Sequence, residues 1–272
     1  METKRQPSIN KTTQFWLIIL TPIFILLSHY LAVYPHEFAH SFMAWALGFK
    51  SNPLAITYGG TSWLNIFFLM HINENVNYLL MLNTHHRLDI SLVAFAGPGI
   101  TNGLMFILSL WLLKKVFIKT KHFLYYFIFL FNLMNLGNFY AYVPIRTLTP
   151  TSMGDAEHFA FGLHISEWWI YSIGTYIVAF LIWHFYTRTL IAAYHTLNIQ
   201  TTTLQAGLMI ICVAILFGFF GMPGFFGYGI ICFFLSASSL LAIPGLIVAL
   251  WPTRNWVKRA LIESNSQIKF YE

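Results

Sequence analysis

The chain has 272 residues, of which 57% are hydrophobic, 18% aromatic and only 9% charged, and its mean hydropathy is +0.64. This composition excludes an ordinary soluble domain. The net charge of +6 does not indicate a nucleic-acid partner, because basic residues of membrane proteins gather in cytoplasmic loops.

Six uncharged stretches come close to or exceed the roughly 20 residues that a helix needs to cross a bilayer. They are residues 15–33, 90–113, 123–143, 168–186, 204–222 and 225–250. The first stretch has no small-residue cleavage site after it, so we expect it to be retained and not removed as a signal peptide. The sequence therefore predicts an all-α integral membrane protein of about six transmembrane helices, with one membrane domain over residues 13–252 and polar tails at 1–12 and 253–272.

The distribution of basic residues predicts the orientation of these helices. With a cytoplasmic N-terminus and six alternating spans, twelve of the fifteen Lys and Arg residues fall on the cytoplasmic side. Only Lys50, Arg87 and Arg146 fall on the other side. We therefore expect a multi-pass protein of the plasma membrane, bacterial in origin, with both termini in the cytoplasm.

Two connections are long, at residues 50–89 and 144–166, and this topology places both on the outer side. In the first, apolar segments flank the turn-like Asn73-Glu74-Asn75. This pattern is compatible with a small β-hairpin or with a re-entrant segment, and periodicity does not separate the two.

The sequence HEFAH follows the first predicted span directly. On a helix, His36 and His40 lie on one face, one turn apart, which is the spacing that two zinc ligands need. Glu37 is then placed to take a proton from water at the metal. Ionisable side chains at the end of an apolar helix are costly unless they are paired or ligated, which favours a metal site over a chance match.

A catalytic zinc usually keeps three protein ligands, so one more is expected. The acidic candidates are Glu74, Asp89, Asp155, Glu157 and Glu167. We favour Asp155, because it follows Gly154 and lies on the same predicted membrane side as HEFAH. Two alternatives stay open: Asp155 caps a helix that begins at Ala156, or Glu157 or His158 takes its place as a ligand.

Three segments resemble signatures of the site-2 proteases, a family of intramembrane zinc metalloproteases. The first is HEFAH with the later glycine pair Gly59-Gly60. The second is AGPGITNG at residues 96–103, which is similar to the family's GPxxN signature. The third joins Asn138, Pro144 and the pair Gly154-Asp155, with wider spacing than the family's NxxPxxxLDG.

The resemblance implies a zinc-dependent peptidase that cleaves membrane-spanning or membrane-apposed proteins within the lipid bilayer. His36, His40 and Asp155 would hold Zn²⁺, Glu37 would be the general base, and Asn138 would hold the substrate or polarise the scissile carbonyl. For Arg146 three roles are open, namely pairing with Asp155, contacting substrate and stabilising an oxyanion, beside the ordinary one of an exposed charge.

Two other functions fit parts of the same pattern. A membrane di-iron enzyme uses several histidine boxes, but no second HxxxH box exists in this sequence. A zinc-binding membrane scaffold or transporter would keep the metal ligands without proteolysis. The presence of Glu37 favours the peptidase, because a scaffold has no need of a base beside its ligands.

Overall fold

The computed structural model describes residues 11–83, 86–150 and 154–270. Within these ranges, six helical segments are long and apolar enough to cross a membrane, which confirms the predicted fold class. They are Lys11–Ala46 (α1), Arg87–Leu113 (α4, η1 and α5), His122–Ile145 (α7 and η2), Glu167–Thr196 (α9, η3 and α10), Thr202–Phe225 (α11, η4 and η5) and Ile230–Leu250 (α12).

Four of these spans contain a π-helical segment, in which the backbone turn is locally wider. The bounds within the spans are α4 Arg87–Phe95, η1 Ala96–Asn102, α5 Gly103–Leu113, α7 His122–Tyr140, η2 Ala141–Ile145, α9 Glu167–His184, η3 Phe185–Thr189, α10 Leu190–Thr196, α11 Thr202–Val213, η4 Ala214–Phe219 and the 3₁₀ turn η5 Pro223–Phe225. Such bulges are frequent at functional sites. Two of them, η1 and η2, lie beside the site described below.

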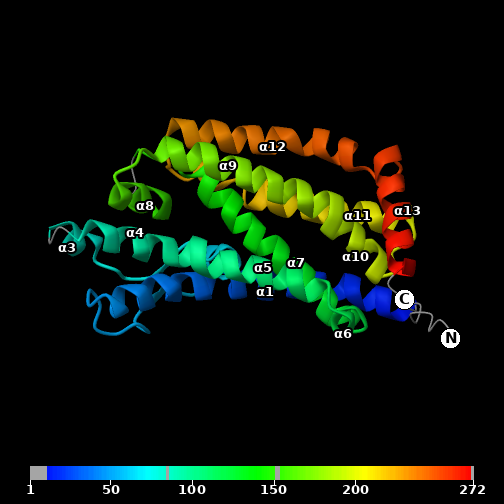
Figure 1. The fold of residues 1–272 in the computed structure, drawn as a ribbon, viewed down its shortest axis with the longest axis horizontal. Helices are drawn as coiled ribbons and strands as arrows, with labels where there is room; N and C mark the ends of the chain where they lie inside the picture. The colour runs from blue at the N-terminus through cyan, green and yellow to red at the C-terminus, as the bar shows by residue number, and fades with distance from the viewer. Residues whose placement is uncertain (1–10, 84–85, 151–153, 271–272) are drawn as a thin grey trace.

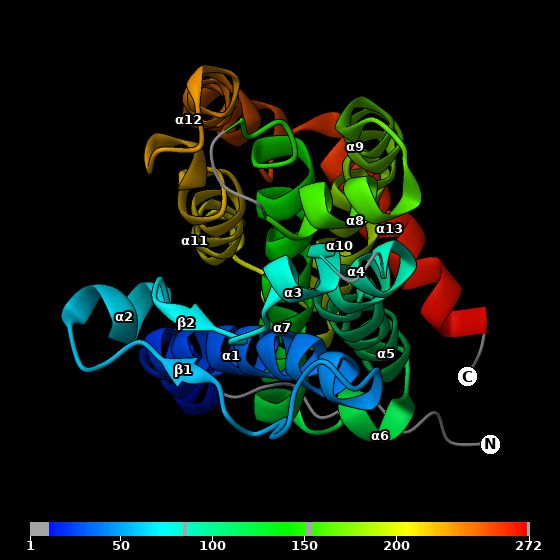
Figure 2. The same ribbon diagram turned by 90° about the vertical axis from the view of Figure 1, so that its left-hand side faces the viewer.

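The long helices run side by side, and the start of α1 and helix α13 (Asn255–Phe270) lie at the same end of the bundle (Figure 1). The short helix α6 (Val116–Lys119) lies at that end too, whereas α3 (Tyr78–Asn83) and α8 (Asp155–Leu163) lie at the opposite end. Figure 2 looks onto this second end and shows α7 in the middle of the bundle. In agreement, 72% of the apolar window of α7 is buried, against 17% for α12.

Helix α1 is one continuous helix of 36 residues that contains both Pro22 and Pro35. At 1.5 Å per residue it is about 54 Å long, so it extends beyond the roughly 30 Å of a bilayer's hydrocarbon core. The sequence HEFAH therefore lies within the same helix as the first membrane span.

The segment after α1 forms a small lobe along the outside of that helix (Figure 2). It contains β1 (Thr57–Tyr58), α2 (Trp63–Phe68) and β2 (Ile72–Asn73), and the two strands pair antiparallel with Thr57 opposite Asn73. The predicted small β element is thus present, but it pairs residues 72–73 with 57–58 and does not turn at Asn73–Asn75. The chain after β2 enters α3 instead, because its apolar side chains pack on α1 and α4, with Met81 fully buried.

Lys50 ties this lobe together. Its ammonium group donates to the backbone carbonyls of Ala55 (2.9 Å), Asn75 (3.3 Å) and Glu74. These bonds hold Glu74, which is remote from α1 in the sequence, beside the HEFAH segment of α1.

The C-terminal segment that was predicted as a polar tail forms helix α13 (Asn255–Phe270). Val257 is 2% exposed and joins the main hydrophobic core, and Ala260 and Leu261 pack against that core. The first half of α13 therefore stabilises the bundle.

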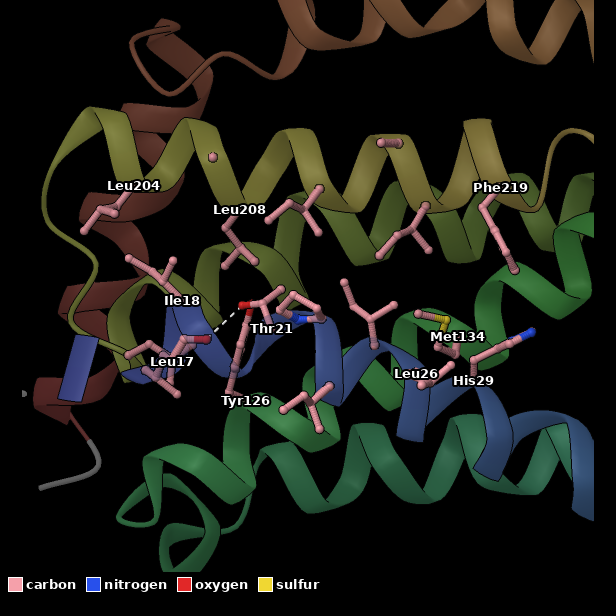
Figure 3. Close-up of a pocket in the computed structure, with 18 of the residues that line it drawn as sticks. Leu17, Ile18, Thr21, Leu26, His29, Tyr126, Met134, Leu204, Leu208 and Phe219 are labelled. Carbon is pink, nitrogen blue, oxygen red and sulfur yellow. Dashed lines mark hydrogen bonds between the residues drawn. The ribbon is translucent and has the colours of Figure 1, made fainter. Parts of the chain in front are cut away.

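A groove of about 1130 Å³ runs between α1 and α11 (Figure 3). Leucine and isoleucine side chains of the two helices face one another across it, and the hydroxyl groups of Thr21 and Tyr126 pair at 2.9 Å. His29 lies at one end of the groove, beside Phe219. The lining of the groove is almost entirely apolar, which suits a surface in contact with lipid.

Candidate metal centre

The three predicted ligands meet at the end of the bundle that holds α8. The Nε2 atoms of His36 and His40 are 3.0 Å apart. The Asp155 carboxylate approaches both, at 3.2 Å from His36 Nε2 and 3.5 Å from His40 Nε2. Among the described residues these three form a cluster, which we call the triad, whose ligand atoms lie within 4.8 Å of one another.

The two histidines project from one face of α1 and are almost completely buried, at 2% and 1% exposure. Room for them comes from Gly97 in η1. A Cβ atom at Gly97 would lie 2.2 Å from His40 Nε2 and 2.8 Å from His36 Cε1. Gly97 is therefore required by the imidazole rings that pack on it, and not only by contact between helices.

Each histidine is held through its second ring nitrogen. The Nδ1 of His40 is 2.6 Å from the carbonyl oxygen of Val93, and the Nδ1 of His36 is 2.6 Å from Oδ1 of Asn102. Because both partners are acceptors, each Nδ1 carries a proton, and Nε2 is the ring nitrogen that faces the other two members of the triad and that a metal would bind.

Asn102 belongs to a chain of hydrogen bonds that links three helices. Its amide nitrogen donates to the carbonyl of Ala32 at 2.9 Å and to Oδ1 of Asn135 at 3.0 Å, and Asn135 donates to the carbonyl of Phe131 at 2.8 Å. Asn102 is fully buried, so its orientation is fixed by these contacts. This arrangement satisfies its side chain away from lipid and fixes the plane of the His36 ring.

Asp155 is the first residue of α8, and the cap residue before it is Gly154. The alternative in which Asp155 caps a helix that begins at Ala156 is therefore wrong, because the helix begins one residue earlier. The Asp155 carboxylate points to the histidines. Burial by itself raises the pKa of the Asp155 carboxyl, but the His40 and His36 rings lower that pKa well below its usual range. The carboxylate is thus ionised, as a metal ligand must be.

The other candidate ligands lie elsewhere. Asp89 pairs with His86 at 2.8 Å on the surface of α4, and Glu167 begins α9. His158 stacks on Tyr78 with the ring centres 3.9 Å apart, and burial lowers its pKa. None of these residues, nor Glu157, belongs to the cluster of ligand atoms found among the described residues.

Glu37 follows His36 on α1 and is half-buried. Its carboxyl group has a close neighbour in Glu74, which the sequence offered only as a candidate ligand. Only the folding of the 50–75 lobe brings Glu74 here, and no local sequence signal indicates it.

Asn138 and Arg146 are not members of the triad. Asn138 is buried on α7 with its side-chain nitrogen unpartnered, and none of the described hydrogen bonds joins it to the triad. Its catalytic role stays a prediction. Arg146 is not an exposed charge, because its guanidinium group lies between the rings of Tyr142 and Tyr228. Within the described residues it forms no ion pair with Asp155.

Sequence reasoning did not find Tyr142. Its ring stacks on His36, with ring centres 4.9 Å apart and an angle of 13° between the planes. The residue lies in the π-helical segment η2. The direction of its side chain therefore does not follow from the spacing of an ordinary α-helix.

Comparison with known proteins gives no identification. No family model, curated protein or solved structure matches this chain. What the geometry provides is a buried set of two imidazole nitrogens and one carboxylate that could hold a metal ion, with the carboxyl groups of Glu37 and Glu74 beside it.

Proposed function

We propose that this protein is a zinc-dependent intramembrane peptidase, a divergent relative of the site-2 proteases. The observation behind the proposal is the spacing of the triad. Zinc bonds of about 2.0–2.1 Å in a tetrahedron put ligand atoms about 3.3 Å apart. The three separations here are 3.0, 3.2 and 3.5 Å.

The donor set also favours zinc over other metals. Two neutral imidazoles and one carboxylate, with further positions left for water and substrate, form a catalytic type of zinc site. Calcium and magnesium prefer sites built wholly of oxygen ligands. Zinc, when bound, lowers the pKa of a water and polarises the scissile carbonyl.

Glu37 is the residue that moves the proton in this proposal. It neighbours a ligand without being one, so its carboxylate accepts the proton of the attacking water and delivers it to the leaving amine. The neighbouring carboxyl group of Glu74 disfavours a second negative charge and so favours the protonated Glu37, which is the form that delivers the proton. Asn102 and Val93 keep the imidazoles oriented throughout.

The substrate in this proposal is a membrane-spanning or membrane-apposed polypeptide. A helix hides its carbonyl groups in hydrogen bonds, so the cleaved segment must be unwound at the site. Strand β1 is exposed along both of its residues and offers an edge at which an extended segment could pair.

Replacing Glu37 by Gln tests proteolysis separately from metal binding. The amide is nearly isosteric and leaves both imidazoles in place, so bound zinc should stay at the wild-type level while cleavage stops. Membrane-protein fragments would be compared by mass spectrometry between cells that express the wild type, Glu37→Gln and the matched control Glu167→Gln. Identical fragment patterns in the three strains, with the proteins expressed and zinc-loaded, would contradict the peptidase and favour a scaffold or transporter.

We also propose that both termini face the cytoplasm, so that the triad opens toward the outer side. The start of α1, the 114–121 segment and α13 lie at one end of the bundle and α8, which begins at Asp155, lies at the other (Figure 1). Most basic residues of the sequence belong to the segments at the first end. Single cysteines at the exposed positions Ser51 and Thr120 distinguish the two orientations, because the native Cys212 and Cys232 are buried. An impermeant maleimide should label position 51 and not position 120 in intact cells. The reverse result would show that the protein has the opposite orientation in the membrane.

A further inference from the structure

Arg146 lies beside the triad at the end of a stack of rings. Its guanidinium carbon is 4.9 Å from the ring centre of Tyr142 and 4.5 Å from that of Tyr228. Tyr142 in turn stacks on His36 at 4.9 Å. Two aromatic faces on one guanidinium fix its plane and direction. The structure thus holds this cation in a defined orientation next to a metal ligand.

The same cation lacks a hydrogen-bond acceptor for one of its donors. Arg146 Nε is buried without a partner, and the described residues offer the guanidinium no salt bridge. Buried polar groups are almost always hydrogen-bonded, so each exception calls for a water or a ligand. In a membrane protein such an arginine marks a functional site more often than a structural one.

Two further unpartnered atoms lie around the same small cavity. The hydroxyl of Thr149 and Oε2 of Glu157 are both buried without a partner, and both residues line this cavity together with Arg146, Asp155 and Tyr228. Its volume is about 10 Å³, the space of a single water-sized group such as one carbonyl oxygen. The cavity therefore presents two donors and one acceptor next to a predicted zinc ligand.

A peptide carbonyl oxygen complements the two donors. It has two lone pairs, one for the Nε–H of Arg146 and one for the hydroxyl of Thr149. The N–H of the same peptide unit points away from that oxygen in a trans peptide, so it does not reach Glu157 through the same cavity.

We propose that Arg146 and Thr149 bind one peptide carbonyl oxygen of the substrate and so fix its register beside the metal. This inference rests on the proposed peptidase function and adds a substrate-binding subsite to it. Arg146 is the principal member, because its geometry is fixed from both faces by the tyrosines.

Hydroxamic acids of increasing length separate the metal site from this subsite. Acetohydroxamic acid contacts the metal alone, whereas N-acetyl-Leu-Leu hydroxamic acid and a succinyl-Leu hydroxamate add peptide units on either side of it. Dissociation constants would be measured by calorimetry on the zinc-loaded full-length protein in nanodiscs. For the wild type we expect at least one extended probe to bind about tenfold or more tighter than acetohydroxamic acid, as hydrogen bonds to a charged group allow.

In Arg146→Gln that gain should fall by about tenfold, while the affinity for acetohydroxamic acid changes less than about twofold. Arg146→Lys should lose most of the gain too, because lysine keeps the charge but not the planar fork. The matched control is Arg87→Gln, which removes an arginine that bonds to His164, the residue directly after α8. Thr149→Val removes the second donor with little change of shape, so it should lose a smaller part of the gain in affinity. This variant is the alternative test if Arg146→Gln does not fold.

If the gain in affinity of both extended probes is unchanged in the Arg146 variants and in Thr149→Val, the inference is overturned. The cavity would then be a site for a water molecule. If acetohydroxamic acid fails to bind the zinc-treated wild type, the proposed function itself is wrong. The two failures are therefore distinguishable.

Discussion

His29 and His36 lie seven residues apart on one helix and are both buried, yet their surroundings differ completely. His36 has a partner at each ring nitrogen, Asn102 on one side and Asp155 with His40 on the other. Neither ring nitrogen of His29 has a well-formed hydrogen bond, although the backbone of Phe68 lies near. Its ring packs edge-on against Phe219 at 5.1 Å, at one end of the apolar groove of Figure 3.

The difference shows what separates a candidate metal ligand from a merely buried histidine. Burial is common to both residues, so it does not decide. What decides is the convergence of polar groups from other elements, here Asn102 of η1 and Asp155 of α8, on the same ring. A metal site is built from such convergence, because ligands need oriented partners behind them.

The largest effect among the single substitutions is expected at Asp155. Removal of a ligand should exceed the loss of an outer-shell partner, so Asp155→Ala should weaken zinc binding by more than about 100-fold. Glu157→Ala, two residues along α8, should bind zinc normally. Competition with a chelator measures both affinities. Wild-type affinity in Asp155→Ala would show that the third ligand is a different residue.

The next effect tests the partner behind His36. Asn102→Ala leaves the His36 ring without its acceptor and should reduce zinc affinity by about 10–100-fold. Asn132→Ala is the matched control, because Asn132 is an equally buried asparagine that bonds to Ser109 and to the carbonyl of Phe106. Equal zinc affinities in the two variants would reduce Asn102 to a packing residue.

The smallest effect belongs to His29. His29→Leu removes a buried polar ring whose nitrogens lack good partners, so the free energy of unfolding should stay level or rise by up to about 1 kcal/mol. Zinc content should not change. Thermal unfolding followed by tryptophan fluorescence, together with metal analysis, checks both. Loss of zinc in this variant would remove the distinction between the two histidines.

The sequence indicated those parts of the site that depend on local spacing. The pair His36 and His40 follows from helical periodicity, and the choice of Asp155 follows from membrane side and scarcity of acids. The long apolar runs in the same way predict the six spans. These inferences need no knowledge of how the helices pack.

Other parts depend on packing and were not predictable. Glu74 reaches Glu37 because Lys50 bonds to backbone carbonyls of the lobe, and Tyr142 reaches His36 because a π-helical turn redirects it. Arg146 was open among several roles for the same reason, since its direction depends on Tyr228, from a distant loop.

The most direct test of the account is the metal content of the purified full-length protein. Wild type should hold about one zinc per chain by mass spectrometry of the metal, and the double variant His36→Ala, His40→Ala should hold almost none. His29→Ala, from the same helix, should match the wild type. Equal zinc in the wild type and the double variant, or a wild type without zinc after exposure to it, would contradict the metal site and the function proposed from it.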